Sequence, residues 1–379
     1  QASVGNYSYL ASYNTSVYPF GISSGNQTAL VSSTLANPYI HWEEVAQTNI
    51  GFDASLFNSR VMFSFDAYLK ETRDMLVKAS IPITSGFEDT TTTYTNAGKV
   101  RNQGIEMSLH TINLTGELGW ETNLTATYNK NKIKDLNSDV PYYINQINNS
   151  YVTMLAKDYP INVFYGYVTD GIFQNQSEVN THAVQPGAEP GDIRFIDQNG
   201  DGMLDTNDRV KVGSGTPKVS LGFNINLTYK DFDLVANFYG DFGAKRYNYT
   251  KYQLERMDHV FNYGKNALNA WTPENPDTDI PRAVSGDPNK NSRTSTRFVE
   301  NGDYLRLNNL QIGYNLPVKY CKKMGLSNLR IYVGATRLFT ITNYKGYDPS
   351  TGSSVGQMGY DYAAIPLSRD FMMGLKFGF

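Results

Sequence analysis

The stretch Asp370-Phe-Met-Met-Gly-Leu-Lys-Phe-Gly-Phe379 alternates large apolar residues with mostly polar or small ones, up to the last residue of the chain. On a β-strand, successive side chains point to opposite faces of the sheet. One face of this stretch therefore carries only apolar side chains, namely Phe371, Met373, Leu375, Phe377 and Phe379. We expect such an unbroken apolar face to meet lipid, so the stretch predicts a membrane-spanning β-strand.

The same period of two recurs along the chain, and it is typical of strands with one apolar and one polar face. In one example, Val61, Phe63 and Phe65 alternate with Ser64 and Asp66. The other segments are residues 44–56, 104–110, 120–129, 219–229, 234–238, 310–314 and 329–335. Most of them approach the roughly ten residues that a tilted membrane strand needs. The sequence predicts an all-β fold with about nine antiparallel strands.

The connections between these strands alternate between short and long. Short links fall near residues 58–59, 114–116 and 230–231, with a moderate one at 317–327. The long links are residues 77–97, 132–216, 243–303 and 343–366. This alternation is typical of a transmembrane up-and-down β-barrel with short periplasmic turns and long extracellular loops. A Greek-key sandwich is not expected to sort its links in this way.

If Phe379 is periplasmic, counting back along the strands places all four long links outside the cell. Residues 1–41 then form an extracellular loop, and residues 42–379 form the barrel strands with their loops. Bacterial barrels have even numbers of strands. An odd number therefore predicts that the chain is the C-terminal part of a larger barrel. We expect the longest link to have little hydrophobic core of its own.

Composition excludes several classes of protein. The net charge is −3 and no basic stripe is visible, so nucleic acid is not expected as a partner. No run of roughly 18 apolar residues predicts a membrane helix. Aromatic residues make up 13% of the chain, with 28 Tyr, which fits either aromatic girdles at membrane interfaces or a Tyr-rich secreted sandwich. The lone Cys321 rules out a disulfide framework.

Residues 197–208 follow the spacing of a calcium loop, with oxygen-bearing side chains at positions one, three, five and nine and Gly202 at position six. The expected ligands are Asp197, Asn199, Asp201, the Met203 carbonyl, Asp205 and Asp208. Asp208 stands at position twelve, where a Glu is usual. Without flanking helices, calcium would serve as a structural clip. The alternative is an Asx-rich turn stabilised by its own side chains.

The sequence carries no catalytic motif. The four His residues are scattered, and no nucleophile elbow, P-loop or Cys-X-X-Cys pattern is present, so we do not expect an enzyme. Aromatic residues of the long links are candidates for stacking on sugar rings or on peptides, or for packing one loop against another. These candidates are Tyr7, Tyr9, Tyr13, Tyr18, Trp42, Tyr142, Tyr143, Tyr165, Tyr167 and Trp271.

Distinctive motifs extend from about residue 37 to the end of the chain. They begin with Asn37-Pro-Tyr-Ile-His-Trp-Glu43, Asn49-Ile-Gly-Phe-Asp53 and Pro190-Gly-Asp-Ile-Arg-Phe-Ile-Asp-Gln-Asn-Gly-Asp-Gly202. They continue with Gly215-Thr-Pro-Lys-Val-Ser-Leu-Gly-Phe223, Glu300-Asn-Gly-Asp-Tyr-Leu-Arg-Leu-Asn-Asn309, Gly346-Tyr-Asp-Pro349 and Pro366-Leu-Ser-Arg369. In these motifs the chain resembles SusC/RagA-type TonB-dependent transporters of Bacteroidetes.

The resemblance implies a 22-stranded outer-membrane barrel that holds an N-terminal plug and is capped by a SusD-type lipoprotein. It also implies import of oligosaccharides or peptides with energy from TonB, in contact with membrane lipid and lipopolysaccharide. We expect the N-terminal strands and the plug on a separate chain, produced by a cut in the loop that begins at Gln1. The alternative function is a secreted, calcium-binding, β-rich glycan-binding module or adhesin.

Overall fold

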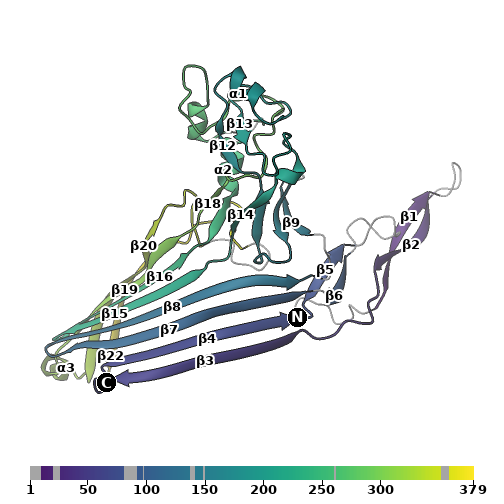
Figure 1. Ribbon diagram of the computed structural model, residues 1–379. Coiled ribbons are helices and arrows are strands. Elements are labelled where there is room, and N and C mark those ends of the chain that lie inside the picture. The colour runs from purple at the N-terminus through teal and green to yellow at the C-terminus, as the bar shows by residue number, and fades with distance from the viewer. Residues whose placement is uncertain are drawn as a thin grey trace.

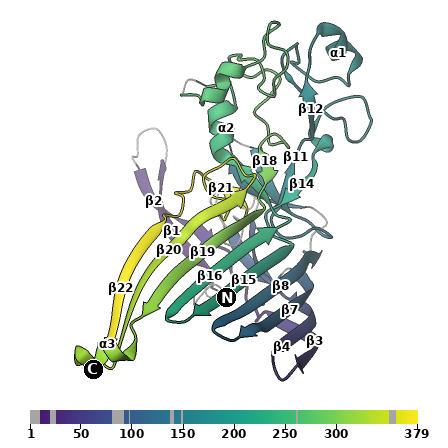
Figure 2. The same cartoon turned by 90° about the vertical axis from the view of Figure 1, so that its left-hand side faces the viewer.

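A computed structural model of the chain describes residues 10–19, 26–80, 92–96, 98–136, 141–147, 150–259, 262–350 and 358–379. Its main element is an open, antiparallel sheet of nine strands within these residues, and Figure 2 shows its curvature. In spatial order the strands are β22 (Asp370–Gly378), β20 (Asn328–Thr342), β19 (Tyr304–Asn315), β16 (Phe232–Phe242), β15 (Val219–Tyr229), β8 (Leu118–Asp135), β7 (Lys99–Thr115), β4 (Val61–Arg73) and β3 (Glu44–Leu56). Each predicted strand coincides with one of these, except that Phe379 lies beyond the end of β22, so the predicted fold is confirmed.

The register of the sheet places apolar side chains next to one another on one face. One row across the sheet consists of Ala54, Phe63, Leu109, Leu124, Phe223, Phe238, Leu307 and Phe339. At one edge of the sheet, Phe371 and Met373 are each 74% exposed. Soluble proteins rarely expose apolar patches larger than a few hundred Å². This face, here called the outward face, is therefore a lipid-facing surface.

The opposite face is polar, although its residues are immediate neighbours of the apolar ones. The adjacent row consists of Asp53, Ser64, Ser108, Thr125, Gly222, Tyr239, Arg306 and Thr340. The ladder of backbone hydrogen bonds between neighbouring strands satisfies the peptide groups that lipid could not. This combination is that of a transmembrane β-barrel wall, and it excludes the alternative of a soluble secreted sandwich.

Short and long connections lie at opposite ends of the sheet (Figure 1). At one end, Lys230 adopts a φ of 52° in the tight turn between β15 and β16, and α3 (Val318–Lys323) lies in the link before β20. The long connections emerge at the other end, where most of them form further strands and short helices. The predicted alternation of link lengths is therefore present. No helix among the described residues is long and apolar enough to cross a membrane.

Two small sheets extend from the N-terminal strands at the long-link end. They pair β1 (Ser12–Pro19) with β2 (Asn26–Thr34) and β5 (Leu76–Ser80) with β6 (Thr92–Asn96).

The two longest links fold together into what we call the loop assembly, residues 150–217, 243–259 and 262–303. Its strands belong to three sheets. One of these sheets also contains a strand that precedes the assembly, and another contains a strand from the last long link. The strands are β9 (Tyr142–Ile147), β10 (Ser150–Leu155), β11 (Val163–Gly166) and β14 (Val210–Ser214); β12 (Thr169–Ile172) and β13 (Ile193–Phe195); and β17 (Lys245–Asn248), β18 (Val299–Asn301) and β21 (Tyr360–Asp361). The helices are α1 (Gln176–Thr181), α2 (Tyr249–Glu255), and the 3₁₀ turns η2 (Thr206–Asp208) and η3 (Lys265–Asn269).

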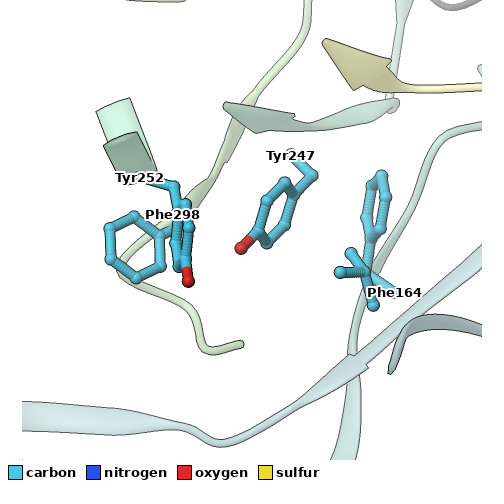
Figure 3. Close-up of a cluster of buried hydrophobic side chains, with 5 residues drawn as sticks. Phe164, Tyr247, Tyr252 and Phe298 are labelled. Atoms are coloured by element: carbon cyan, nitrogen blue, oxygen red, sulfur yellow. The ribbon is translucent and has the colours of Figure 1, made fainter. Parts of the chain in front are cut away.

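The loop assembly contains several hydrophobic clusters, so the expectation that the longest link has little core was wrong. The first cluster joins Phe164 to Tyr247, Tyr252 and Phe298, which are fully or almost fully buried (Figure 3). The second contains Tyr167, Ile172, Ile193, Phe195 and Leu204. These residues lie in strands of three or four residues, in α2 or outside regular elements, so no periodic pattern marks them in the sequence.

Candidate functional site

The loop assembly forms an open cleft with a volume of about 820 Å³. Its walls come from the segments around residues 151–167, 186–209, 252–256 and 288–294. Four basic side chains line it (Arg209, Arg256, Lys290 and Arg293), against one lining carboxylate, that of Asp205. We call it the arginine cleft. Its lining therefore carries more basic than acidic side chains, and Asp258 offsets the charge of Arg256.

The three arginines of the cleft lie against aromatic rings. The Arg293 guanidinium carbon is 4.7 Å from the centre of the Tyr167 ring and 4.5 Å from that of Phe195. Arg209 lies 4.6 Å from Tyr165, and Arg256 lies 5.1 Å from Tyr252. Stacking on an aromatic face attracts the cation. The edge of the Arg256 guanidinium is paired with the Asp258 carboxylate, to which it donates from Nε and Nη2.

Hydrogen bonds to backbone carbonyls fix Arg293 and Arg209 further. Arg293 donates from Nε to the Lys290 carbonyl (3.1 Å) and from Nη2 to the Asn289 carbonyl (2.7 Å). Arg209 donates to the carbonyls of Tyr151 and Tyr165. Burial lowers the pKa of Arg293, so desolvation already disfavours its positive charge. An anionic ligand would offset this cost.

A network of buried polar side chains holds the walls of the cleft. Asn291 donates from Nδ2 to Asp192 Oδ1 (2.8 Å) and accepts from the Ile193 amide at 2.7 Å. Gln185 donates to the Ile193 carbonyl (2.8 Å) and accepts from the Phe195 amide (3.1 Å). These bonds tie segments about 100 residues apart into one rigid wall, because buried polar groups strongly favour remaining paired.

The structure explains why position 191, in the motif Pro190-Gly-Asp-Ile193, is a glycine. Its φ is +92°, and a Cβ added there would lie 2.4 Å from Cε3 of Trp271. Only glycine meets both requirements without strain. Trp271 in turn donates from its indole nitrogen to Gln174 Oε1 at 3.0 Å and packs against the second cluster. Trp271 therefore joins one loop to another.

The structure brings some of the predicted aromatic residues to the cleft. Tyr167 lines it, and Tyr165 supports Arg209 from behind. Tyr13 and Trp42 are 61% and 77% exposed and do not belong to its lining. Tyr7 and Tyr9 lie outside the described residues, as do the side chains of Tyr18, Tyr142 and Tyr143. Their predicted role as substrate contacts stays a prediction.

The basic residues of the cleft were not predicted from the sequence. Arg209, Arg256 and Arg293 are separated by tens of residues and belong to no recognisable spacing. Only the tertiary pairing of the two long links brings them together. A count of basic residues within the links alone would not have distinguished them from solvated surface residues.

The Asp-rich loop at residues 197–208 is held by its own backbone. Asp197 accepts from the amides of Gly200 (2.7 Å) and Gly202 (2.8 Å), and these bonds, led by that from Gly202, lower the pKa of its carboxyl. Asp201 accepts from the Met203 amide at 2.9 Å. These are the contacts of an Asx-rich turn.

Asp208, the predicted twelfth ligand, has a structural role. It is fully buried and accepts from the amides of Gln198 (2.9 Å) and Asp205 (2.8 Å), and it forms a capping box with Asp205 at η2. In the described part of the chain, no group of three or more His, Cys, Asp or Glu is arranged around a possible ion. The side chains predicted to bind calcium thus accept hydrogen bonds from N–H groups, and calcium binding stays a prediction.

Comparison with known proteins agrees with this architecture. The family model described as "TonB dependent receptor-like, beta-barrel" matches residues 3–336. TonB-dependent receptor P3 of Formosa agariphila is 33% identical over 390 residues, covering 100% of this chain and 38% of that protein. TonB-dependent receptor SusC of Bacteroides thetaiotaomicron is 27% identical, covering 98% of this chain and 35% of that protein.

Among solved structures, the RagAB peptide transporter matches with a TM-score of 0.81 and 26% identity, over 99% of this chain and 39% of the matched chain. The RagAB importer in its closed-closed state gives a TM-score of 0.77 at 27% identity. The chain thus spans less than two fifths of the length of these relatives. The strands, their register and these matches lead to one conclusion: the chain belongs to the TonB-dependent receptor family and forms part of its outer-membrane β-barrel.

Proposed function

We propose that the chain is part of an outer-membrane importer in which the long links face the outside of the cell. The lipid-facing sheet and the match to a peptide transporter support this orientation, since barrels of this kind have their long loops outside. The loop assembly then meets incoming substrate first. The substrate is an oligosaccharide or a peptide.

We propose that the arginine cleft contacts this substrate and favours one with an anionic group. The observation that carries this proposal is the stacking of Arg209, Arg256 and Arg293 on aromatic rings around one cleft. A carboxylate accepts charge-assisted hydrogen bonds from guanidinium and ammonium groups, and the rings provide surface for a sugar or a peptide side chain. Acidic glycans and peptides with free carboxylates share this chemistry.

The importer needs partners beyond the described strands. Within the described residues, β3 and β22 each have a neighbour on one side only. Exposed strand edges do not occur in the hydrocarbon region, so further strands complete the barrel. A plug domain, a SusD-type lipoprotein over the loops and energy from TonB complete the proposed machine. Family membership and the likeness to SusC and to the RagAB complex support these partners.

Binding calorimetry on the purified complex tests the cleft. Acidic oligosaccharides and free-carboxylate peptides are compared with their neutral and amidated counterparts. Lys290→Gln removes an exposed charge from the cleft, and Lys265→Gln removes one outside its lining. We expect Lys290→Gln alone to weaken binding of the acidic probe, by roughly tenfold for one charge-assisted contact. Equal binding by both variants, or no preference for the acidic probe, would contradict the proposal.

A further inference from the structure

Arg256, which lines the arginine cleft, is paired with a carboxylate of the protein itself. Its guanidinium donates from Nε to Asp258 Oδ1 and from Nη2 to Asp258 Oδ2, the latter at 2.7 Å. Both side chains are mostly buried, with 14% of Arg256 and 10% of Asp258 exposed. A guanidinium binds the carboxylate of a ligand with the same two-bond geometry. Asp258 therefore holds the position on Arg256 that such a carboxylate would need.

The other two arginines of the cleft are held by groups that cannot leave. Arg209 and Arg293 donate to backbone carbonyls. A carbonyl moves away only if the local backbone rearranges, whereas the Asp258 side chain can rotate. Burial lowers the pKa of Arg293, whereas the hydrogen bonds to Asp258 raise the pKa of Arg256. The positive charge of Arg256 is thus already matched by a carboxylate.

Arg256 is also what holds the Asp258 carboxylate in place. Within the part of the chain that the structure describes, no other group donates a hydrogen bond to it. The Asp192 carboxylate in the wall of the cleft differs, because besides Arg282 it accepts from Asn291 and from the Glu189 amide. An anionic group that replaces Asp258 on Arg256 therefore breaks one pair and disturbs no wider network.

The backbone between the two partners is strained. Helix α2 ends at Glu255, and Met257 has a φ of +64°. This left-handed conformation reverses the chain after the helix and brings Asp258 back to Arg256. It is unusual for a side chain as large as that of Met, because Cβ comes close to the following carbonyl oxygen. The ion pair and the burial of Met257 offset this strain, so loss of the pair removes one of the two contributions.

We propose that Asp258 is a specificity-determining residue of the arginine cleft, because it competes with the anionic group of the substrate for Arg256. This inference rests on the proposed function of the cleft. Asp258 is tethered next to Arg256, so its effective concentration is on the order of millimolar or higher. A substrate displaces it only with the help of further contacts, such as those to Lys290, Arg293 or the rings. The cleft therefore selects a carboxylate that is carried by a larger sugar or peptide.

Binding calorimetry on the purified complex tests this inference. The acidic probes are tri-galacturonate and tri-glutamate, and their neutral counterparts are the methyl ester of the first and tri-glutamine. The test variant Asp258→Asn removes the competing charge and keeps the size of the side chain. The matched control Asp170→Asn removes the same charge from the exposed partner of Arg194, outside the lining of the cleft. Arg256→Gln, alone and combined with Asp258→Asn, completes a double-mutant cycle.

We expect Asp258→Asn to bind an acidic probe roughly tenfold more tightly than the wild type and the control do, as one freed charge-assisted contact would give. Binding of the neutral probes should stay unchanged, and the gain should vanish in the Arg256→Gln background. Hydrogen exchange of the wild type gives a readout that needs no variant. An acidic probe should speed exchange of residues 257–259, because it releases Asp258.

Equal affinities of Asp258→Asn and the control would overturn the inference. So would a gain that persists in the Arg256→Gln background, because Asp258 would then act through net charge and not through Arg256. Slower or unchanged exchange of residues 257–259 in the presence of a bound acidic probe would show that the pair stays intact, which also overturns the inference. Failure of the wild type and of every variant to bind either acidic probe would instead overturn the proposed function of the cleft.

Discussion

Arg282 donates two hydrogen bonds to the buried carboxylate of Asp192, across 90 residues of sequence. Nε lies 3.0 Å from Oδ1 and Nη2 lies 3.1 Å from Oδ2. The same carboxylate accepts from Asn291, and the third guanidinium nitrogen reaches Glu189. This pair links the two longest connections of the barrel, so the wall of the arginine cleft depends on it.

Replacing Arg282 by Met should loosen this wall. Asp192 would be left as a buried charge without its cation. Breaking a buried ion pair in this way lowers the free energy of unfolding by about 3–5 kcal/mol. Hydrogen exchange of residues 185–195 in the purified complex measures the effect. The control is Arg194→Gln, because the Asp170 partner of Arg194 is 60% exposed and such pairs contribute about 1 kcal/mol or less. Similar exchange in both variants would contradict the role given to Arg282.

Gly191→Ala tests the contact between Gly191 and Trp271. Both Gly191 and Gly200 have positive φ, of +92° and +73°, but a Cβ at Gly200 meets nothing within 4 Å. Backbone strain of about 1–2 kcal/mol applies to both alanine variants, and only Gly191→Ala adds a clash with the indole. Limited proteolysis should therefore cut the loop assembly faster in Gly191→Ala than in Gly200→Ala. Adding Trp271→Ala to Gly191→Ala should restore part of the protection against proteolysis. No restoration would show that the clash with the indole does not cause the faster cleavage.

If the Asp-rich loop binds calcium, its protection against proteolysis should depend on the ion. Chelation should speed proteolysis of residues 175–213 if the ion replaces amide partners of Asp197 and Asp201. Asp201→Asn is the informative variant, because it removes charge from an exposed side chain and leaves the buried Asp208 intact. Unchanged protection after chelation of the wild-type protein would show that the loop is an Asx-rich turn alone.

The strands of the barrel wall could be predicted from the sequence because each contains its own alternation, independent of distant residues. The prediction of strand ends fails where a strand is locally irregular. β19 begins at Tyr304 rather than Leu310, because a register shift between Leu307 and Asn309 breaks the period of two. With the extra residue, Leu307 returns to the outward face, where it pairs with Phe339.

The candidate site was largely hidden from the sequence for a different reason. Its aromatic member Tyr167 was among the predicted contacts, but Arg293 acquires its position only through bonds to the Lys290 and Asn289 carbonyls and through stacking on Tyr167. The stacking joins segments more than 100 residues apart. No periodicity within one segment encodes these contacts.

Charge placed on either face of β15 should separate the lipid-facing side chains from the polar ones. Ile225 lies on the outward face near the middle of the strand, and Asn226 is its neighbour on the polar face opposite Glu121. Ile225→Lys should destabilise the barrel by about 2–4 kcal/mol, as basic side chains do at the bilayer midplane. Asn226→Lys introduces the same side chain beside a carboxylate and should cost little. Urea unfolding in lipid vesicles measures both variants, and equal losses of stability would contradict the assignment of the outward face.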